Sequence, residues 1–175
     1  MNFETKHSHF AILSDTHNDI INIHLAVNYC KDNAIDTIIH YGDLTCPDTV
    51  CLFKGFQIIR VVGNGDLETQ KIQTCLSNQN KHFYTGSVFE GTINGLTVAV
   101  THGHITKTFN QLLTNSPAQY IFHGHTHQKR KTTIHGKHVI NPGSIGGTYR
   151  GDSRSFGIFN IQTYRLEFIE LDALL

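Results

Sequence analysis

The first half of the chain alternates short apolar runs with helical segments, and this order is the strongest constraint on the fold. The apolar runs cover residues 10–13, 36–40 and 57–62, and each ends at a polar residue or a glycine, as buried strands do. The segments that follow them, 18–31, 48–54 and 68–76, are expected to be helical. Alternation of strand and helix predicts a parallel sheet with right-handed crossovers.

The second half has a different pattern, which predicts hairpins. Runs 88–93 and 96–101 flank Asn94-Gly95, the strongest short hairpin signal. Further strand pairs are expected at 129–134 with 137–140 and at 155–161 with 166–171, together with a helical patch at 109–113 and a strand at 120–122. A largely antiparallel second half favours two sheets packed face to face with helices outside.

Length and composition narrow the class of protein. The 175 residues fit one domain, which we place at 9–175, after a flexible N-terminal extension over 1–8. Lys+Arg and Asp+Glu balance at 14 each, so neither stable nucleic-acid binding nor membrane binding is expected. No apolar run is long enough for a membrane span, and the polar start lacks a signal peptide, so we expect the cytoplasm. Four Cys without a C-x-x-C pair are expected to be free thiols.

Polar residues follow five of the predicted strands. Because the carboxyl ends of parallel strands gather at one edge of a sheet, these residues can converge although they lie far apart in sequence. The stretches are Asp15-Thr16-His17, Gly42-Asp43, Gly63-Asn64, His102-Gly103-His104 and Gly124-His125-Thr126-His127.

Each of these residues also has an ordinary explanation. Asp15 fits a helix cap as well as a ligand, and Asp19 and Asp66 are read mainly as caps. The histidine-rich stretch fits a solvated loop as well as a metal site. Four other histidines carry no partner pattern and are read as surface or core residues: His40, His82, His135 and His138. The set of five strand ends, rather than any member of it, exceeds what turn chemistry predicts.

Taken together, the set offers two carboxylates, one amide oxygen and four imidazoles. Mixed oxygen and nitrogen ligands suit Mn, Fe, Zn, Co or Ni rather than Ca, and the absence of thiolates argues against a structural zinc site. Seven ligands are too many for one metal with an open position. They suit two metals about 3.5–4 Å apart that share one bridging carboxylate.

The ordered series Asp-x-His, Gly-Asp, Gly-Asn, His and Gly-His-x-His resembles the signature of the calcineurin-like metallophosphoesterases. Asn141-Pro142-Gly143-Ser144 further resembles the small single-domain bacterial and archaeal phosphodiesterase branch. The resemblance runs from about Phe10 to Leu171 and implies an α/β fold, a four-layer α/β/β/α sandwich of two mixed β-sheets flanked by helices.

The resemblance also implies a role for each matched residue. Asp15, His17 and His127 would hold one divalent metal, Asn64, His102 and His125 the other, and Asp43 would bridge them and act in catalysis. Mn²⁺ is the first choice, with Ni²⁺, Co²⁺, Fe²⁺ and Zn²⁺ as alternatives. A hydroxide bridging the metals would attack a phosphodiester in line, and Asn64 would also contact the substrate.

One position departs from the family pattern. Many larger relatives carry His after the motif Asn, where it assists the leaving group, and here this position is Gly65. Loss of a positioned acid typically costs about 10²–10⁴-fold, so we expect good leaving groups, as in nucleotide-type or activated aryl diesters. His104 is the candidate replacement acid or a substrate contact, and a supporting or surface role is equally open.

The remaining expectations concern two arginines, His123 and the alternatives to a phosphodiesterase. Arg150 is the candidate for substrate binding, because Arg binds phosphate bidentately, whereas Arg154 is read as a solvated loop charge. His123 is read as a supporting residue rather than a ligand. The alternatives to a phosphodiesterase are a non-catalytic metal-binding scaffold, as in the retromer subunit that resembles this branch, and a phosphomonoesterase; the sequence leaves a homo-oligomer open.

Overall fold

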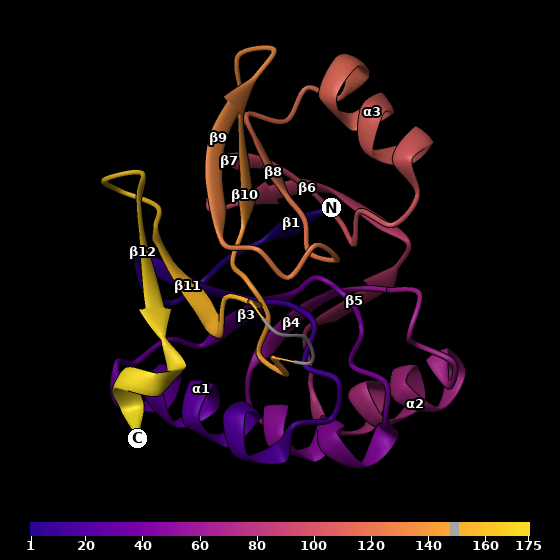
Figure 1. Cartoon of the computed structure of the whole chain (residues 1–175), viewed down its shortest axis with the longest axis vertical. Coiled ribbons are helices and arrows are strands. Elements are labelled where there is room, and N and C mark those ends of the chain that lie inside the picture. The colour runs from indigo at the N-terminus through magenta and orange to yellow at the C-terminus, as the bar shows by residue number, and fades with distance from the viewer. Residues whose placement is uncertain (148–150) are drawn as a thin grey trace.

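The computed structural model describes residues 1–147 and 151–175, and it contains two mixed six-stranded sheets packed face to face (Figure 1). The first sheet has the order β12 (Arg165–Glu170), β11 (Ser155–Asn160), β2 (His9–Leu13), β3 (Thr37–His40), β4 (Gln57–Val61) and β5 (Phe83–Gly86). The second has the order β1 (Asn2–Phe3), β6 (Val88–Ile93), β7 (Leu96–Thr101), β8 (Tyr120–Phe122), β10 (Lys137–Asn141) and β9 (Arg130–Ile134).

Helices cover the outer face of each sheet and complete the four layers. Figure 1 shows α1 (Ile20–Asp32) and α2 (Thr69–Gln79) beneath the first sheet and α3 (Thr106–Asn115) beside the second. Two short 3₁₀ helices, η1 (Pro47–Phe53) and η2 (Leu171–Leu174), also lie on the side of the first sheet that carries α1 and α2. The predicted α/β/β/α sandwich is confirmed.

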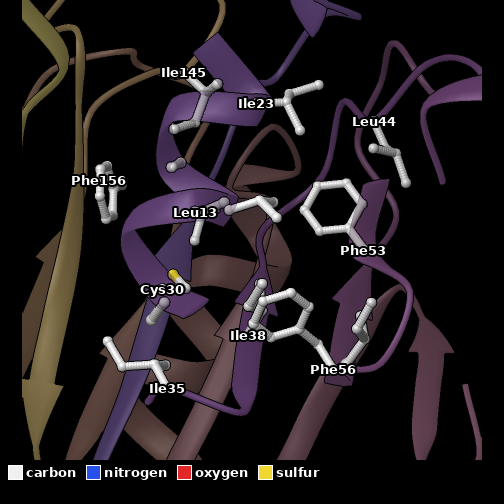
Figure 2. Packing of buried hydrophobic residues seen from close by; sticks show 14 of the residues in the cluster. Leu13, Ile23, Cys30, Ile35, Ile38, Leu44, Phe53, Phe56, Ile145 and Phe156 are labelled. Carbon is white, nitrogen blue, oxygen red and sulfur yellow. The ribbon is translucent and has the colours of Figure 1, made fainter. Parts of the chain in front are cut away.

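Strand periodicity explains how one chain builds three apolar layers. In β2, Ala11 and Leu13 pack against α1, whereas Phe10 and Ile12 face the second sheet. Successive strand residues point to opposite faces, so a strand covered on both sides is apolar throughout. Figure 2 shows the layer between α1 and the first sheet, where burial raises the pKa of the Cys30 thiol to about 12. All four Cys are free.

Four features differ from the prediction. Residues 1–8 are not a loose extension, because β1 pairs in parallel with β6 and Phe3 is buried. Strand β5 was not expected, and it pairs in parallel with β4. The three predicted hairpins are present and the second sheet is mixed as predicted, but β8 pairs in parallel with both β7 and β10, so the second half is less antiparallel than its hairpin pattern indicated. The predicted helix at 48–54 is the 3₁₀ helix η1.

No helix in the part of the chain that the structure describes has the length and apolar character needed to cross a membrane.

Candidate metal centre

The polar stretches after β2, β3, β4, β7 and β8 meet at one edge of the sandwich. Backbone hydrogen bonds tie their loops together: Asp15 N–H donates to Gly42 O at 3.1 Å, His17 N–H to Asp43 O at 3.0 Å, and Gly124 N–H to His102 O at 3.0 Å. The two sheets therefore deliver their strand ends to a common place, as the sequence predicted for parallel strands.

The side chains in this place form two candidate cation sites that share Asp15. The first group is Asp15, His17 and His127, with His127 Nε2 at 3.3 Å from Asp15 Oδ1 and 3.4 Å from His17 Nε2. The second group is Asp15, Asp43 and His102, and Asn64 Oδ1 lies 3.1 Å from His102 Nε2. Six of the seven predicted ligands thus lie at one centre, and the carboxylate common to both groups is Asp15, whereas the resemblance implied Asp43 as the shared ligand.

Asp43 belongs to the second group and also faces His17 of the first. Its Oδ2 is 3.6 Å from His17 Nε2 and 3.6 Å from His102 Nε2, so one oxygen faces a histidine of each predicted metal. The other oxygen, Oδ1, accepts the Gly65 N–H at 2.7 Å. One oxygen of Asp43 is held by the backbone and the other is free to contact a metal ion, as a bridging ligand requires.

The carboxylates and imidazoles at this centre do not satisfy one another's hydrogen-bonding needs, and a divalent cation would. Asp15 Oδ1 is buried and receives no hydrogen bond of good geometry from any described residue, and a buried acceptor in that state is costly. Burial raises the pKa of Asp15, but His127, His102 and the Ser14 hydroxyl together hold it below its ordinary value. Asp15, with help from Asp152, raises the pKa of His127 to about 9. A cation would satisfy both the orphaned oxygen and the facing imidazoles.

Backbone strain is concentrated at the predicted ligands. Left-handed backbone is uncommon for residues other than glycine, costs about 1–2 kcal/mol per residue, and clusters at functional sites. Five of the seven predicted ligands adopt it: Asp15 (φ 52°), His17 (φ 41°), Asp43 (φ 57°), His125 (φ 67°) and His127 (φ 56°). The loops therefore hold these five side chains at a conformational cost, a pattern typical of functional sites.

The motif glycines are required because ligand carboxylates touch the backbone there. A Cβ at Gly63 would lie 2.1 Å from Asp43 Oδ1, and one at Gly124 would lie 1.8 Å from Ser14 Oγ and 2.7 Å from Asp15 Oδ2. Neither position can carry a side chain without displacing the neighbouring loop. The glycine before Asn64 and the one before His125 therefore serve the placement of Asp43 and Asp15.

A buried ion pair supports the loop of Asp43, and the sequence reading missed it. The sequence predicts a helix cap at Asp66, but the N-cap residue of α2 is Glu68. Asp66 Oδ2 instead lies 3.0 Å from Arg60 Nη2 and accepts the N–H groups of Asp43 at 3.1 Å and Gly63 at 2.7 Å. Asp19, by contrast, caps α1 as predicted. An acidic residue two positions after Asn64 is equally typical of a helix cap and of a buried ion pair, so the sequence pattern alone does not distinguish the two roles.

His40 lies under the same loop. Its Nδ1 accepts the Gly42 N–H at 3.3 Å, and its Nε2 lies 3.2 Å from Thr16 Oγ1. Burial, with the charge of Arg60, lowers the pKa of His40 to about 4 from an ordinary 6.5. His40 is therefore a core histidine held neutral, one of the two roles expected for it.

This depressed pKa predicts acid sensitivity. Between pH 6.5 and 4 the unfolded chain binds a proton at His40 that the folded chain does not, so stability is full above 6.5 and falls as the pH drops through this window. The loss from this group is about 3 kcal/mol at most. Urea unfolding in chelator should show that the free energy of unfolding of His40→Gln depends less steeply on pH than that of the wild type. The control His24→Gln, on the exposed face of α1, should show the same pH dependence as the wild type. Equal slopes in all three proteins would contradict the assignment of His40.

Two residues of the Asn141–Ser144 motif hold the ligand loops from behind. Ser144 Oγ donates to Asp15 O at 2.9 Å, and Asn141 Nδ2 donates to Gly124 O at 2.9 Å. Both residues are fully buried. This motif supplied the resemblance to the small phosphodiesterase branch, and its physical role is to fix the backbone of Asp15 and of the His125 loop.

Asp152 is a further partner that the sequence reading missed. Its Oδ2 lies 2.8 Å from His127 Nδ1, on the side of the ring away from Asp15. A carboxylate in this position fixes the imidazole tautomer so that Nε2 faces the metal, and outer partners of this kind typically contribute about 10–100-fold in metal affinity. A single Asp in a glycine-rich loop gave no signal that it would meet His127.

Asp152→Asn is accordingly expected to weaken binding of Mn²⁺ by about 10–100-fold, because the amide removes the charge that favours this tautomer. Metal titration of the chelator-stripped protein checks this. Asp172→Asn, which alters the exposed partner of Arg154, is the matched control. An affinity that is unchanged in Asp152→Asn would show that His127 needs no carboxylate.

The remaining predicted residues are placed as follows. His125 is exposed, and its ring centroid lies 5.1 Å from that of His102; the exposed His104 ring lies 5.2 Å from His102 and 6.1 Å from His125. His123 packs on Phe109 with Nδ1 at 3.1 Å from Gly124 O, a supporting position.

Arg150 lies outside the described residues. Arg154 donates to Asp172 and Asn22, so it is a paired rather than a freely solvated charge.

Comparison with known proteins supplies the family. The calcineurin-like phosphoesterase superfamily domain matches residues 9–164. Phosphodiesterase MJ0936 of Methanocaldococcus jannaschii is 29% identical over 142 residues, covering 80% of this chain and 86% of that protein. A solved archaeal phosphodiesterase superposes with a TM-score of 0.86 at 27% identity, covering 93% and 99% of the two chains. The Escherichia coli phosphoesterase Yfce shares the fold, with a TM-score of 0.66 at 16% identity over 93% and 99%. This chain belongs to the calcineurin-like phosphoesterase superfamily.

Proposed function

We propose that the chain is a metal-dependent phosphodiesterase with a dinuclear centre. The observation that carries the proposal is the position of Asp43, whose Oδ2 is equally distant from His17 and His102 while Oδ1 is anchored by Gly65. The names of the archaeal relatives support a diester substrate. Good leaving groups are expected, which includes nucleotide-type diesters.

The first group at the centre matches one set of ligand roles, and the second set extends the other group. Asp15, His17 and His127 would hold one divalent cation. Asn64, His102 and His125 would hold the other, with Asn64 and the His125 ring close to His102. Asp43 contacts both. Mn²⁺ is the first choice, with Ni²⁺, Co²⁺, Fe²⁺ and Zn²⁺ as alternatives. When bound, the ions lower the pKa of a water between them and offset negative charge on the phosphate.

Gly65, the position that departs from the family pattern, lies against the Asp43 carboxylate. A Cβ at Gly65 would lie 3.1 Å from Asp43 Cγ and Oδ1, so the carboxylate would have to shift by a few tenths of an ångström to accept a side chain there. The Gly65 N–H anchors Asp43, and the leaving group receives no proton from this position.

His104 fits a substrate contact better than a proton donor. Its ring is exposed beside His102 and His125. Burial on its inner side, with the neighbouring charges of His102 and His125, lowers the pKa of His104 below its ordinary value. A neutral imidazole at pH 7 donates a hydrogen bond readily but is a weak source of a proton. We assign His104 to the phosphate oxygens or the leaving group as a hydrogen-bond donor.

The test is hydrolysis of bis-p-nitrophenyl phosphate by the chelator-stripped protein supplied with Mn²⁺, Ni²⁺, Co²⁺ or Zn²⁺. Turnover that requires metal and exceeds that of p-nitrophenyl phosphate supports the proposal. Faster turnover of the monoester would identify a phosphomonoesterase instead. Tight metal binding without turnover of either compound would identify a scaffold.

A further inference from the structure

Four exposed aliphatic side chains lie close in sequence to predicted ligands of the candidate metal centre. In the described ranges 1–147 and 151–175, seven large hydrophobic side chains are exposed. Four of them form what we call the apolar rim: Ile20 (52% exposed), Ile21 (71%), Leu67 (90%) and Ile105 (49%). The other three are the two terminal residues and Tyr164 in the turn between β11 and β12.

Each rim residue follows a predicted ligand along the chain. Ile20 comes three residues after His17, Leu67 three residues after Asn64, and Ile105 three residues after His102. A chain extends at most about 3.6 Å per residue, so each of these Cα atoms lies within about 11 Å of its ligand's Cα. Ile21 lies one residue further along α1.

The three ligand loops that carry the rim are joined at the centre. His17 N–H donates to Asp43 O at 3.0 Å, Asp43 Oδ2 lies 3.6 Å from His102 Nε2, and His102 Nε2 lies 3.1 Å from Asn64 Oδ1. The rim therefore approaches the metal centre from three different loops, two of the first sheet and one of the second.

These four side chains belong to none of the buried core clusters of the described residues. The core face of α1 is formed by Ile23, Ala26 and Val27, and that of α2 by Ile72 and Leu76. Single exposed apolar residues are ordinary, but several gathered around one polar site indicate a binding surface. Because the apolar rim remains exposed to solvent in the folded protein, a ligand that covers it gains free energy from the apolar surface removed from water.

We propose that the apolar rim binds the ester groups of the substrate, and that the substrate is a phosphodiester with at least one bulky apolar ester group. The inference rests on the proposed function. Rim residues lie within four positions of a predicted ligand, so the rim borders the reacting centre. A protein docked there would exclude the substrate, whereas the substrate's own ester groups reach the rim while the phosphate faces Asp43.

The experiment compares two diesters with the same leaving group, bis-p-nitrophenyl phosphate and methyl p-nitrophenyl phosphate, in the Mn²⁺-loaded protein. The wild type should prefer the bis-aryl compound, and Leu67→Ser and Ile21→Ser should each reduce that preference in kcat/KM by about 3–10-fold, chiefly through KM. Leu175→Ser, with an 83% exposed leucine at the C-terminus, is the matched control and should leave the preference unchanged.

The outcomes separate this inference from the proposed function. Turnover of both diesters with the same preference in wild type and rim variants would overturn the inference and leave the phosphodiesterase intact. An equal loss in Leu175→Ser would also overturn it. A wild type that hydrolyses neither diester with any of the metals would overturn both.

Discussion

Asp43→Asn is expected to lower metal-dependent hydrolysis of bis-p-nitrophenyl phosphate by at least about a thousandfold, in line with the removal of a catalytic group that acts as part of a unit. The amide has nearly the same shape, and its oxygen can still accept the Gly65 N–H. The group that faces His17 and His102 at 3.6 Å, however, becomes a neutral NH₂. An NH₂ cannot bridge two cations, so the variant should also lose part of its bound metal.

Steady-state rates and metal content per chain measure both effects. Asp48→Asn changes an exposed carboxylate in η1 a few residues away and should behave as the wild type. The unfolding midpoint in chelator should be similar for both variants, which shows that a lost rate is not lost folding. Retained activity in Asp43→Asn together with two bound metals would refute the bridging role.

Asp66→Asn is expected to reduce the free energy of unfolding by about 3–5 kcal/mol, because removing one member of a buried ion pair leaves the other charge uncompensated. The side chains of Arg60 and Asp66 are 1% and 0% exposed. Asp66 also accepts the N–H groups of Asp43, Gly63 and Thr45, so its charge is offset by donors as well as by Arg60. Burial raises the pKa of Asp66, but Arg60 and the N–H groups of Gly63 and Thr45 together bring this pKa below its ordinary value.

Urea unfolding in chelator measures this loss. Glu68→Gln is the control, because Glu68 pairs with Lys71 at 3.2 Å on the exposed start of α2. Exposed pairs of this kind contribute at most about 1 kcal/mol. Asp66→Asn should also weaken metal binding, since the Asp43 loop loses its support. A variant as stable as the wild type would mean that Arg60 finds another partner.

The sequence alone determined most of the framework. Strands β6, β7 and β8 begin and end where predicted. Asn94-Gly95 marks the turn between β6 and β7, and β8 is recognisable because a strand covered on both faces is apolar along its length. The order of strands and helices determined the parallel pairing of β2, β3 and β4. The candidate ligands were visible for the same reason: Asp, Asn and His at the ends of apolar strands have no packing role.

The tertiary structure decided what those local patterns do not encode. Strand β1 is two residues long and pairs with β6 across the sheet, so its order depends on a partner some ninety residues away. Asp66 and Asp152 resemble ordinary turn residues until Arg60 and His127 are brought against them. Apolar periodicity indicates which side of one segment is buried. It does not indicate which residue will pair with a buried charge, or where the backbone will turn left-handed to orient a ligand. Both are decided only where the ends of separate strands meet.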